Sequence, residues 1–329
     1  MKILITGGAG YVGSSLARHL LDKGHEIAIL DNFRFGEEPI KEIKDKITII
    51  HGDLREMSQR EMMDVPLLKN TDAVIHLAAT SKEPTSLYDN RYTLELNYFA
   101  TKRLADACKE AGTKFIYASS CSVYFSYSLP KIPNLEKEYW KLDKELPLMR
   151  EDDDLNPISP YSITKRASEE HLLSIADDKF KPVILRKGTI FGVSPRMRFD
   201  IVVNALVKTS FFNKEITVLK DIFRPLVDLK TVVLAYEKAL TLDSTEIINI
   251  LDFNISLTDL AEKVAKILPI NPKINVKEVS VERNYRASGA KMLDLDFKPV
   301  GDFEKSVKEI WNFLKKNPED KKIYYNAKI

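Results

Sequence analysis

Tyr161 and Lys165 carry the clearest chemical signal in the chain, within the segment Tyr-Ser-Ile-Thr-Lys. Their i, i+4 spacing places the phenol and the ammonium on one face of a helix. A free tyrosine has a pKa of about 10 and is a poor base at neutral pH, and a nearby cation favours the phenolate. The spacing alone is weak support, because roughly one tyrosine in ten would show it by chance in a chain this rich in lysine.

A serine near the end of a predicted strand is the next candidate. The segment 115–124 reads FIYASSCSVY, a buried strand that runs into a hydroxyl-rich turn. Ser120 is placed to hydrogen-bond a reacting alcohol or carbonyl. A cap at the end of the strand explains the same serine when the segment is taken by itself.

A glycine-rich loop follows the first predicted strand and opens the first predicted helix. The segment 6–13 reads TGGAGYVG and satisfies G-x-x-G-x-x-G as well as G-x-G-x-x-G. Glycines let backbone N–H groups approach a pyrophosphate, and the helix N-terminus adds a favourable dipole. We expect Gly7, Gly10, Tyr11, Val12 and Gly13 to contact a dinucleotide.

Two aspartates downstream of this loop predict which dinucleotide binds. Asp31 ends the second predicted strand, where a carboxylate accepts hydrogen bonds from the adenosine ribose and repels a 2′-phosphate, so NAD is predicted rather than NADP. Arg34 lies close in sequence and opposes this preference. Asp53 follows the third predicted strand and can reach the adenine amino group, although a helix N-cap explains it equally well.

The elements that position these residues alternate between strands and helices in the first half of the chain. We predict strands at 2–6, 26–30, 47–50, 72–77, 114–118 and 182–186, and helices at 11–23, 91–111 and 160–177. That alternation is typical of an α/β fold with a Rossmann-type, doubly wound parallel sheet.

A smaller α/β lobe is predicted from about residue 193, with helices at 199–209, 231–242, 256–267 and 303–315 and a strand at 215–219. The NAD-binding domain is assigned to 1–192 and 225–252, and the substrate domain to 193–224 and 253–329, with the ligand cleft between them. The polar stretch 125–160 is expected to be a loop that covers the site, or a simple insertion. The polar tail after Lys315 is expected to be frayed.

Composition excludes several classes of protein. The 329 residues include 50 basic and 48 acidic side chains without a basic block, which argues against a nucleic-acid partner. No export signal is visible, Cys108 and Cys121 have no ligand spacing, and no apolar run is long enough to cross a bilayer, so a cytoplasmic protein is predicted. The five histidines form no ligand pattern; His76 is expected in the core and no metal is predicted.

Taken together, these segments resemble the extended short-chain dehydrogenase/reductases, in particular the NAD-dependent epimerase/dehydratase group of nucleotide-sugar enzymes. The resemblance rests on 6–13, 31–32, 52–54, 76–79, Asn97, 119–124, 161–165, 185–186, 191–192 and 224–225. It implies a catalytic set of Ser120, Tyr161 and Lys165. It also implies cofactor contacts from Asn32, Asp53, Leu54, Leu77, Ala78, Ala79 and Asn97, besides the glycine loop and Asp31.

The same resemblance implies the substrate residues. Arg224 and Arg283 are expected to face a substrate diphosphate, and the other candidates are Ser81, Ser120, Thr189, Arg198 and Asn204. Many relatives have an asparagine in place of Thr189, which leaves the sugar nucleotide open. Dehydratases of the group usually carry Thr-Asp-Glu where this chain has Ser120-Cys121-Ser122, so dehydration is disfavoured. Relatives form dimers through helices that correspond to 91–111 and 160–177, and a homodimer is expected.

The predicted function is therefore an NAD-dependent nucleotide-sugar epimerase that oxidises a sugar hydroxyl, most simply at C4, and reduces it again. A reductase of nucleotide 4-keto sugars would use the same residues and is the alternative. A non-catalytic NAD-binding regulator has no need for the intact set of Ser120, Tyr161 and Lys165 and is the weaker third possibility.

Overall fold

The computed structural model describes residues 1–64, 68, 70–81, 89–124, 147–220, 222–278, 284–319 and 325–326. Its larger part is a seven-stranded sheet in the order β11-β7-β5-β4-β1-β2-β3, in which every neighbouring pair is parallel. The strands are β1 (Lys2–Thr6), β2 (Glu26–Asp31), β3 (Thr48–His51), β4 (Ala73–His76), β5 (Lys114–Ser120), β7 (Val183–Lys187) and β11 (Glu246–Ile250). The predicted Rossmann-type fold is confirmed.

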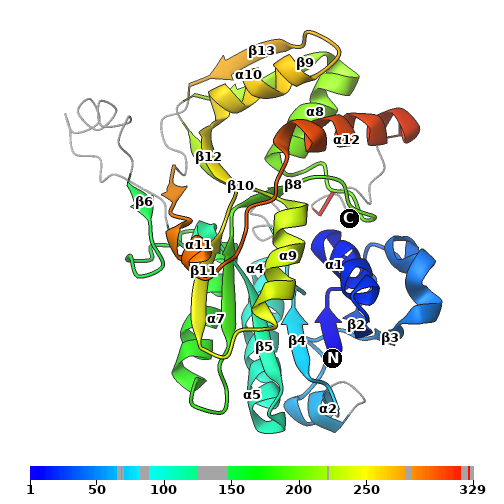
Figure 1. Cartoon of the computed structure of the whole chain (residues 1–329), viewed down its shortest axis with the longest axis vertical. Coiled ribbons are helices and arrows are strands. Elements are labelled where there is room, and N and C mark those ends of the chain that lie inside the picture. Colours follow the sequence, from blue (N-terminus) through cyan, green and yellow to red (C-terminus); the bar gives the residue numbers. More distant parts are fainter. Residues whose placement is uncertain are drawn as a thin grey trace.

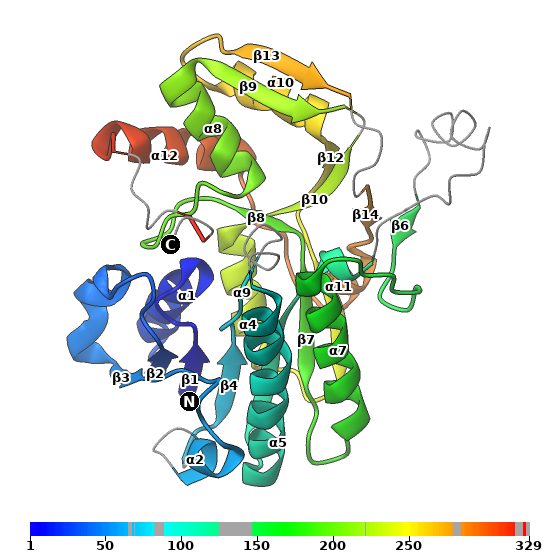
Figure 2. The same cartoon turned by 180° about the vertical axis from the view of Figure 1, so that it is seen from behind.

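Helices cover both faces of this sheet (Figures 1 and 2). On one face lie α1 (Tyr11–Asp22) and α9 (Leu229–Ala239); on the other lie α2 (Gln59–Asp64), α4 (Asn90–Leu94), α5 (Thr101–Ala111) and α7 (Pro160–Ile175). The central strands are buried from both sides, which explains their continuous apolar runs. The strand order reverses between β1 and β4, and the crevice at that point is where open α/β sheets bind ligands.

The single helix predicted over 91–111 is divided by a wider turn. A π-helical segment, η2 (Glu95–Ala100), lies between α4 and α5. Its Asn97 carbonyl accepts hydrogen bonds from the hydroxyls of Thr101 (2.8 Å) and Ser168 (2.9 Å). A π turn frees a carbonyl from the regular helical ladder, and here side chains use it to join this helix to α7.

The second lobe lies above the carboxyl ends of the sheet strands (Figure 1). A three-stranded sheet is formed by β8 (Thr189–Phe191), β10 (Phe223–Asp228) and β12 (Phe253–Ser256), and a two-stranded sheet by β9 (Glu215–Leu219) and β13 (Lys273–Lys277). Helices α8 (Val202–Asn213), α10 (Leu257–Ile267) and α12 (Phe303–Lys316) pack with them. The predicted domain boundaries stay a prediction.

Shorter elements complete the described part: η1 (Glu38–Lys46), η3 (Cys121–Val123), α11 (Ala290–Asp294), and the paired strands β6 (Leu148–Met149) and β14 (Arg286–Ala287). Residues 125–146 of the predicted covering loop lie outside the described residues. The following residues are fixed to the sheet edge, because the Asn249 N–H donates to the Glu151 carboxylate at 2.8 Å. Among the helices that the structure describes, none is long and apolar enough to cross a membrane.

Candidate active site

A cavity of about 700 Å³ opens between the two lobes at the carboxyl ends of the central strands. The predicted cofactor residues that line it are Gly7, Gly10, Tyr11, Val12, Gly13, Asp31, Asn32, Asp53, Leu54, Leu77, Ala78 and Ala79. The predicted catalytic and substrate residues that line it are Ser81, Ser120, Tyr161, Lys165, Thr189, Arg198 and Arg224. The fold therefore brings together residues from nearly the whole length of the chain.

Three predicted site residues are not placed in this lining. Asn97 is fully buried. Its amide oxygen accepts from the Thr80 N–H at 2.8 Å, and its amide nitrogen donates to the Thr80 carbonyl at 3.0 Å. Asn204 is also fully buried; it donates to the Arg198 carbonyl at 2.8 Å and accepts from the Gly192 N–H at 3.2 Å. Both side chains position neighbours of the cavity rather than face it. Arg283 lies outside the described residues.

The glycine loop packs so closely against neighbouring backbone that side chains would not fit at Gly7 and Gly13. Gly7 has φ +72, and a Cβ there would lie 2.8 Å from the Ala78 nitrogen. A Cβ on Gly13 would lie 2.3 Å from the Gly7 carbonyl oxygen. The loop runs into the first turn of α1, whose first N–H groups have no partner within the helix. This cradle fits the pyrophosphate of a dinucleotide.

The two predicted aspartates lie at the adenosine end of the cavity. Asp31 accepts the Ala9 N–H (3.0 Å) and the Phe33 N–H (2.9 Å), one on each oxygen. Burial raises its pKa, and these hydrogen bonds oppose the rise. A carboxylate oxygen can accept more than one hydrogen bond, so Asp31 can still bind ribose hydroxyls.

Asp53 is engaged by neighbouring side chains rather than by a helix. Burial raises its pKa, but hydrogen bonds from Arg55, at 2.7 Å for the shortest, hold the pKa below its ordinary value. Asn32 also donates to Asp53, at 3.2 Å. The helix that follows, α2, begins only at Gln59, so Asp53 is not its N-cap.

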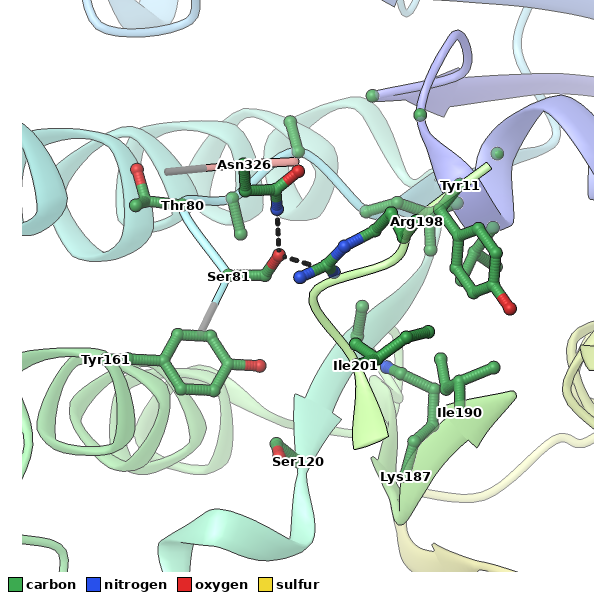
Figure 3. Close-up of a pocket in the computed structure, with 18 of the residues that line it drawn as sticks. Tyr11, Thr80, Ser81, Ser120, Tyr161, Lys187, Ile190, Arg198, Ile201 and Asn326 are labelled. Atoms are coloured by element: carbon green, nitrogen blue, oxygen red, sulfur yellow. Dashed lines mark hydrogen bonds between the residues drawn. The ribbon is translucent and has the colours of Figure 1, made fainter. Parts of the chain in front are cut away.

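The predicted catalytic hydroxyls meet inside the cavity. Helix α7 begins with a capping box between Ser159 and Ser162, which fixes the direction of its first turn. The Tyr161 hydroxyl and Ser120 both face the open space (Figure 3). Burial raises the pKa of Tyr161, and a hydrogen bond with Ser120 and the charge of Arg198 oppose this rise.

Lys165 lines the same cavity and is only 3% exposed. Its ammonium is 4.6 Å from the centroid of the Tyr117 ring and 5.9 Å from that of Tyr161. Burial lowers the pKa of Lys165 to about 7. The i, i+4 prediction of a shared face is thus consistent with the geometry, and the amine is poised to change charge near neutral pH.

A second lysine in the lining, Lys187, was missed at the sequence level. Its ammonium donates to the Ser119 carbonyl (2.9 Å) and to the Tyr236 hydroxyl (3.0 Å). Burial, followed by the charge of Lys165, lowers its pKa well below the ordinary value. The available signal was its position: Lys187 ends a strand that is otherwise buried, at the edge of the sheet where ligands bind.

A buried ion pair holds α7 against the sheet. The Arg186 guanidinium on β7 bonds both Glu169 oxygens, at 2.7 Å for the shortest contact, and both side chains are almost fully buried. The Ser119 hydroxyl also donates to Glu169. Because β5, β7 and α7 meet at this pair, it fixes Ser120 relative to Tyr161.

The opposite wall of the cavity is a polar chain of contacts. Arg198 pairs with Asp200 (2.8 Å) and donates to the Ser81 hydroxyl (3.0 Å), which also accepts from Asn326 at 2.8 Å (Figure 3). The tail was predicted to be frayed after Lys315, and for residues 325–326 that is wrong. Tyr325 is 7% and Asn326 8% exposed. Because the Tyr325 ring is buried, this segment lies against the protein and Asn326 reaches the cavity.

His76 was expected in the core, and the structure confirms this. His76 is buried between the hydroxyls of Thr6 (2.7 Å) and Thr101 (2.8 Å), and burial lowers its pKa to about 3. Cys108 and Cys121 are buried and unpaired with each other. Within the described residues, no group of three or more His, Cys, Asp or Glu side chains is arranged to hold a metal ion.

A parallel sheet with a glycine cradle at its switch point and a tyrosine–lysine helix beside it is the arrangement of a dinucleotide-binding enzyme. Its family follows from comparison with known proteins. The NAD dependent epimerase/dehydratase family matches residues 3–250, and the chain belongs to that family. The predicted family, enzyme class and NAD cofactor are confirmed.

The curated relatives are named for more than one sugar nucleotide. The chain is similar to an uncharacterized UDP-glucose epimerase, YtcB, of Bacillus subtilis (31% identity, 67% of this chain, 66% of YtcB). It is equally similar to UDP-glucuronic acid decarboxylase 1 of Xenopus tropicalis (31% identity, 60% of this chain, 43% of the relative). The chain thus spans less than two thirds of the length of both curated relatives.

Solved structures share the fold over nearly the whole chain. UDP-glucuronic acid 4-epimerase from Bacillus cereus, in complex with UDP-glucuronic acid and NAD, is similar at a TM-score of 0.80 and 25% identity, over 96% of this chain and 100% of that one. UDP-N-acetylglucosamine 4-epimerase from Methanobrevibacter ruminantium reaches the same TM-score, 0.80, at 23% identity, over 96% of this chain and 98% of that one.

Proposed function

We propose that this protein is an NAD-dependent nucleotide-sugar epimerase that works by transient oxidation of a sugar hydroxyl, most simply at C4. The observation that carries the proposal is that the Tyr161 and Ser120 side chains face the same cavity (Figure 3), with the Lys165 ammonium 5.9 Å from the centroid of the Tyr161 ring. Relatives that are named as epimerases of UDP-glucose and UDP-glucuronic acid support the same reaction class.

The proposed roles follow from the chemistry of these side chains. When bound, NAD supplies the acceptor for the hydride that leaves the sugar carbon and the donor that returns it. Tyr161 takes the proton of the sugar hydroxyl. Ser120 donates a hydrogen bond to the same oxygen while it becomes a carbonyl. Tyr161 gives the proton back when the carbon is reduced on its other face, so the configuration is inverted.

Two positive charges, on Arg198 and Lys165, favour the phenolate form of Tyr161, the proposed proton acceptor. The Arg198 guanidinium and the Ser120 hydrogen bond act against the burial that raises the Tyr161 pKa. Lys165, 5.9 Å from the ring, adds a positive charge whenever it is protonated. We also propose that Gly7, Gly13 and Asp31 hold the cofactor, with Leu54, Leu77, Ala78 and Ala79 lining its path.

Substrate contacts are proposed on the opposite wall of the cavity. Ser81, Thr189, Arg198 and Arg224 line it, and their donors suit the hydroxyls and diphosphate of a sugar nucleotide. Elimination is not proposed. Cys121 and Ser122 are buried and offer no carboxylate where dehydratases of the family usually have an acidic pair.

A homodimer is part of the proposal. Four large apolar side chains are exposed on neighbouring helices α4, η2 and α7: Leu94, Phe99, Ile163 and Leu173, each at least 42% exposed. Large apolar side chains exposed on adjoining helices would be buried if these helices formed an interface. A cytoplasmic location is proposed from the sequence alone.

The test asks whether the hydride that leaves the sugar returns to the same carbon. The purified protein is incubated with UDP-, GDP-, dTDP- and CDP-hexoses, without added cofactor, and the sugars are identified by mass spectrometry and NMR. We expect one nucleotide sugar to be interconverted with its C4 epimer, with no net change in the absorbance of reduced nicotinamide. Deuterium placed at the reacting carbon should stay there, because the hydride does not exchange with water. Stoichiometric consumption of added NADH or NADPH by a 4-keto sugar nucleotide, with no interconversion of any hexose, would overturn the proposal.

A further inference from the structure

Arg196 is a buried arginine with unused donors. It is only 3% exposed and lines the cavity, yet its Nε and Nη2 are buried without a hydrogen-bond partner among the described residues. Arg198, two residues further along, differs: it pairs with Asp200 and donates to Ser81. A buried guanidinium donor that is left unpaired is costly, so its presence indicates a ligand.

The position of Arg196 shows which part of a ligand it meets. The Ser194 hydroxyl donates to the Tyr11 carbonyl at 2.6 Å and contacts the Ser14 hydroxyl at 3.2 Å. These bonds tie the segment that carries Arg196 to the first turn of α1, the turn that follows the glycine cradle. On its other side the guanidinium stacks on Phe35, with Cζ 3.9 Å from the ring centroid. Arg196 therefore lies between the cradle and the loop after Asp31.

The charges around Arg196 leave it without a full counterion. Asp31 and Asp200 act on it favourably, Arg198 opposes it, and burial is the largest effect, so its pKa is lowered to about 9. It is still protonated at neutral pH. Asp31 makes no hydrogen bond to the Nε or Nη2 of Arg196; the hydrogen bonds that the structure shows for its oxygens include those from the Ala9 and Phe33 N–H groups.

We propose that the Arg196 guanidinium binds the pyrophosphate of NAD, as a second phosphate-binding group opposite the N-terminus of α1. A guanidinium presents its donors in a planar fork that matches phosphate oxygens, and the stack on Phe35 fixes that plane. The cofactor would then be held by the second lobe as well as by the Rossmann sheet. A 2′-phosphate is the other anion that could reach this region, but the Asp31 carboxylate opposes it.

Calorimetry with fragments of the cofactor tests the proposal without any activity assay or sugar substrate. NAD, ADP and adenosine are titrated into the wild type and into Arg196→Met, with Arg91→Met, an exposed residue on α4, as the control for the change in net charge. We expect Arg196→Met to weaken the affinities for NAD and ADP by about tenfold or more and to leave the affinity for adenosine within about twofold of the wild type. Arg91→Met should change none of these affinities.

Adenosine binding that falls as much as ADP binding would show that Arg196 only shapes the loop around Phe35, and unchanged ADP binding would exclude the contact outright. A larger loss for 2′,5′-ADP than for ADP would assign the guanidinium to a 2′-phosphate and overturn the proposal. Should Arg196→Met fail to fold, Arg196→Lys keeps the charge and removes the fork, and we expect a partial loss for ADP with none for adenosine. These outcomes are independent of the epimerase proposal, since they concern the cofactor alone.

Discussion

The two ends of the cavity are built on opposite principles. At the cofactor end the wall is backbone: Gly7 and Gly13 lack side chains because a Cβ would meet main-chain atoms within 3 Å. At the reaction end the wall includes ionisable side chains withdrawn from water: Lys165 is buried, Lys187 nearby is half-buried, and both have lowered pKa values. Binding a dinucleotide requires space, whereas proton transfer requires charge at a fixed place.

This difference predicts how each end responds to substitution. At the cofactor end a small added volume should weaken binding, because main-chain atoms cannot move aside as a flexible side chain can. At the reaction end the loss of a polar atom should reduce turnover while binding persists. The buried cations should also lower stability, since desolvating a charge is costly.

The largest effect is expected for Tyr161→Phe, which removes the proton acceptor and keeps the packing of the ring. We expect kcat to fall by roughly a hundredfold or more, with the Kd for NAD and the melting temperature nearly unchanged. The measurement is turnover on the sugar nucleotide identified as substrate, together with calorimetry of NAD. Near wild-type turnover would remove Tyr161 from the reaction and leave the reaction end without its base.

An intermediate effect is expected for Gly13→Ala at the cofactor end. The added Cβ would lie 2.3 Å from the Gly7 carbonyl oxygen and 2.7 Å from the Gly8 Cα, so the cradle must shift, at about 1–3 kcal/mol. NAD affinity should fall by about tenfold or more. The control is Gly289→Ala, where the nearest atom is a Leu251 side-chain carbon at 3.4 Å. Equal NAD affinities for the two variants would show that NAD binding does not depend on the absence of a side chain at Gly13.

The smallest effect concerns the stability cost of Lys165. Its pKa is about 7 in the folded protein and about 10.4 in the unfolded chain. Between these values the unfolded state binds a proton that the folded state lacks, so wild-type stability should rise with pH through this window. Lys165→Met removes the buried charge. We expect it to be more stable than the wild type at pH 7, with the difference fading toward pH 10.

Thermal melts of the wild type, Lys165→Met and Lys298→Met across that range provide the comparison. Lys298 is an exposed lysine with a side chain 75% accessible, so its variant should follow the wild type at every pH. A Lys165→Met protein that is less stable than the wild type at pH 7 would mean that the ammonium stabilises the fold through Tyr117 more than its burial costs.

Local pattern was enough for much of the fold and for the cofactor end. The glycine loop, Asp31 and the helix of Tyr161 and Lys165 are short segments whose function depends on neighbours in sequence, and all of them line the cavity. Strand positions were predicted within a few residues because both faces of the sheet are buried, which leaves uninterrupted apolar runs. The split of 91–111 by a π turn was not predictable, because the hydroxyls that bond the freed carbonyl include Ser168 on another helix.

The contacts along the substrate wall of the cavity could not be predicted from the sequence. Asn204 was expected to contact substrate, but in the fold it spans Gly192 and Arg198 from within the core. Asn326 was dismissed with the tail, yet it reaches Ser81, 245 positions earlier in the chain. Neither placement has a local signature, because each depends on two segments that meet only when the lobes pack.

The sequence by itself determined the Rossmann sheet, the glycine loop and the tyrosine–lysine helix, because each is encoded in residues whose spacing matches one turn, one strand or one helix face. The family was expected from the resemblance of many such segments, and the NAD cofactor from Asp31. Only the tertiary structure decided which charges face one another across the cavity. Lys187 beside Lys165, and Arg196 with unpaired donors next to the cradle, are consequences of burial and of contacts between distant segments. Electrostatic environment is a property of the packed interior, where charges are deprived of water, and no local sequence pattern records it.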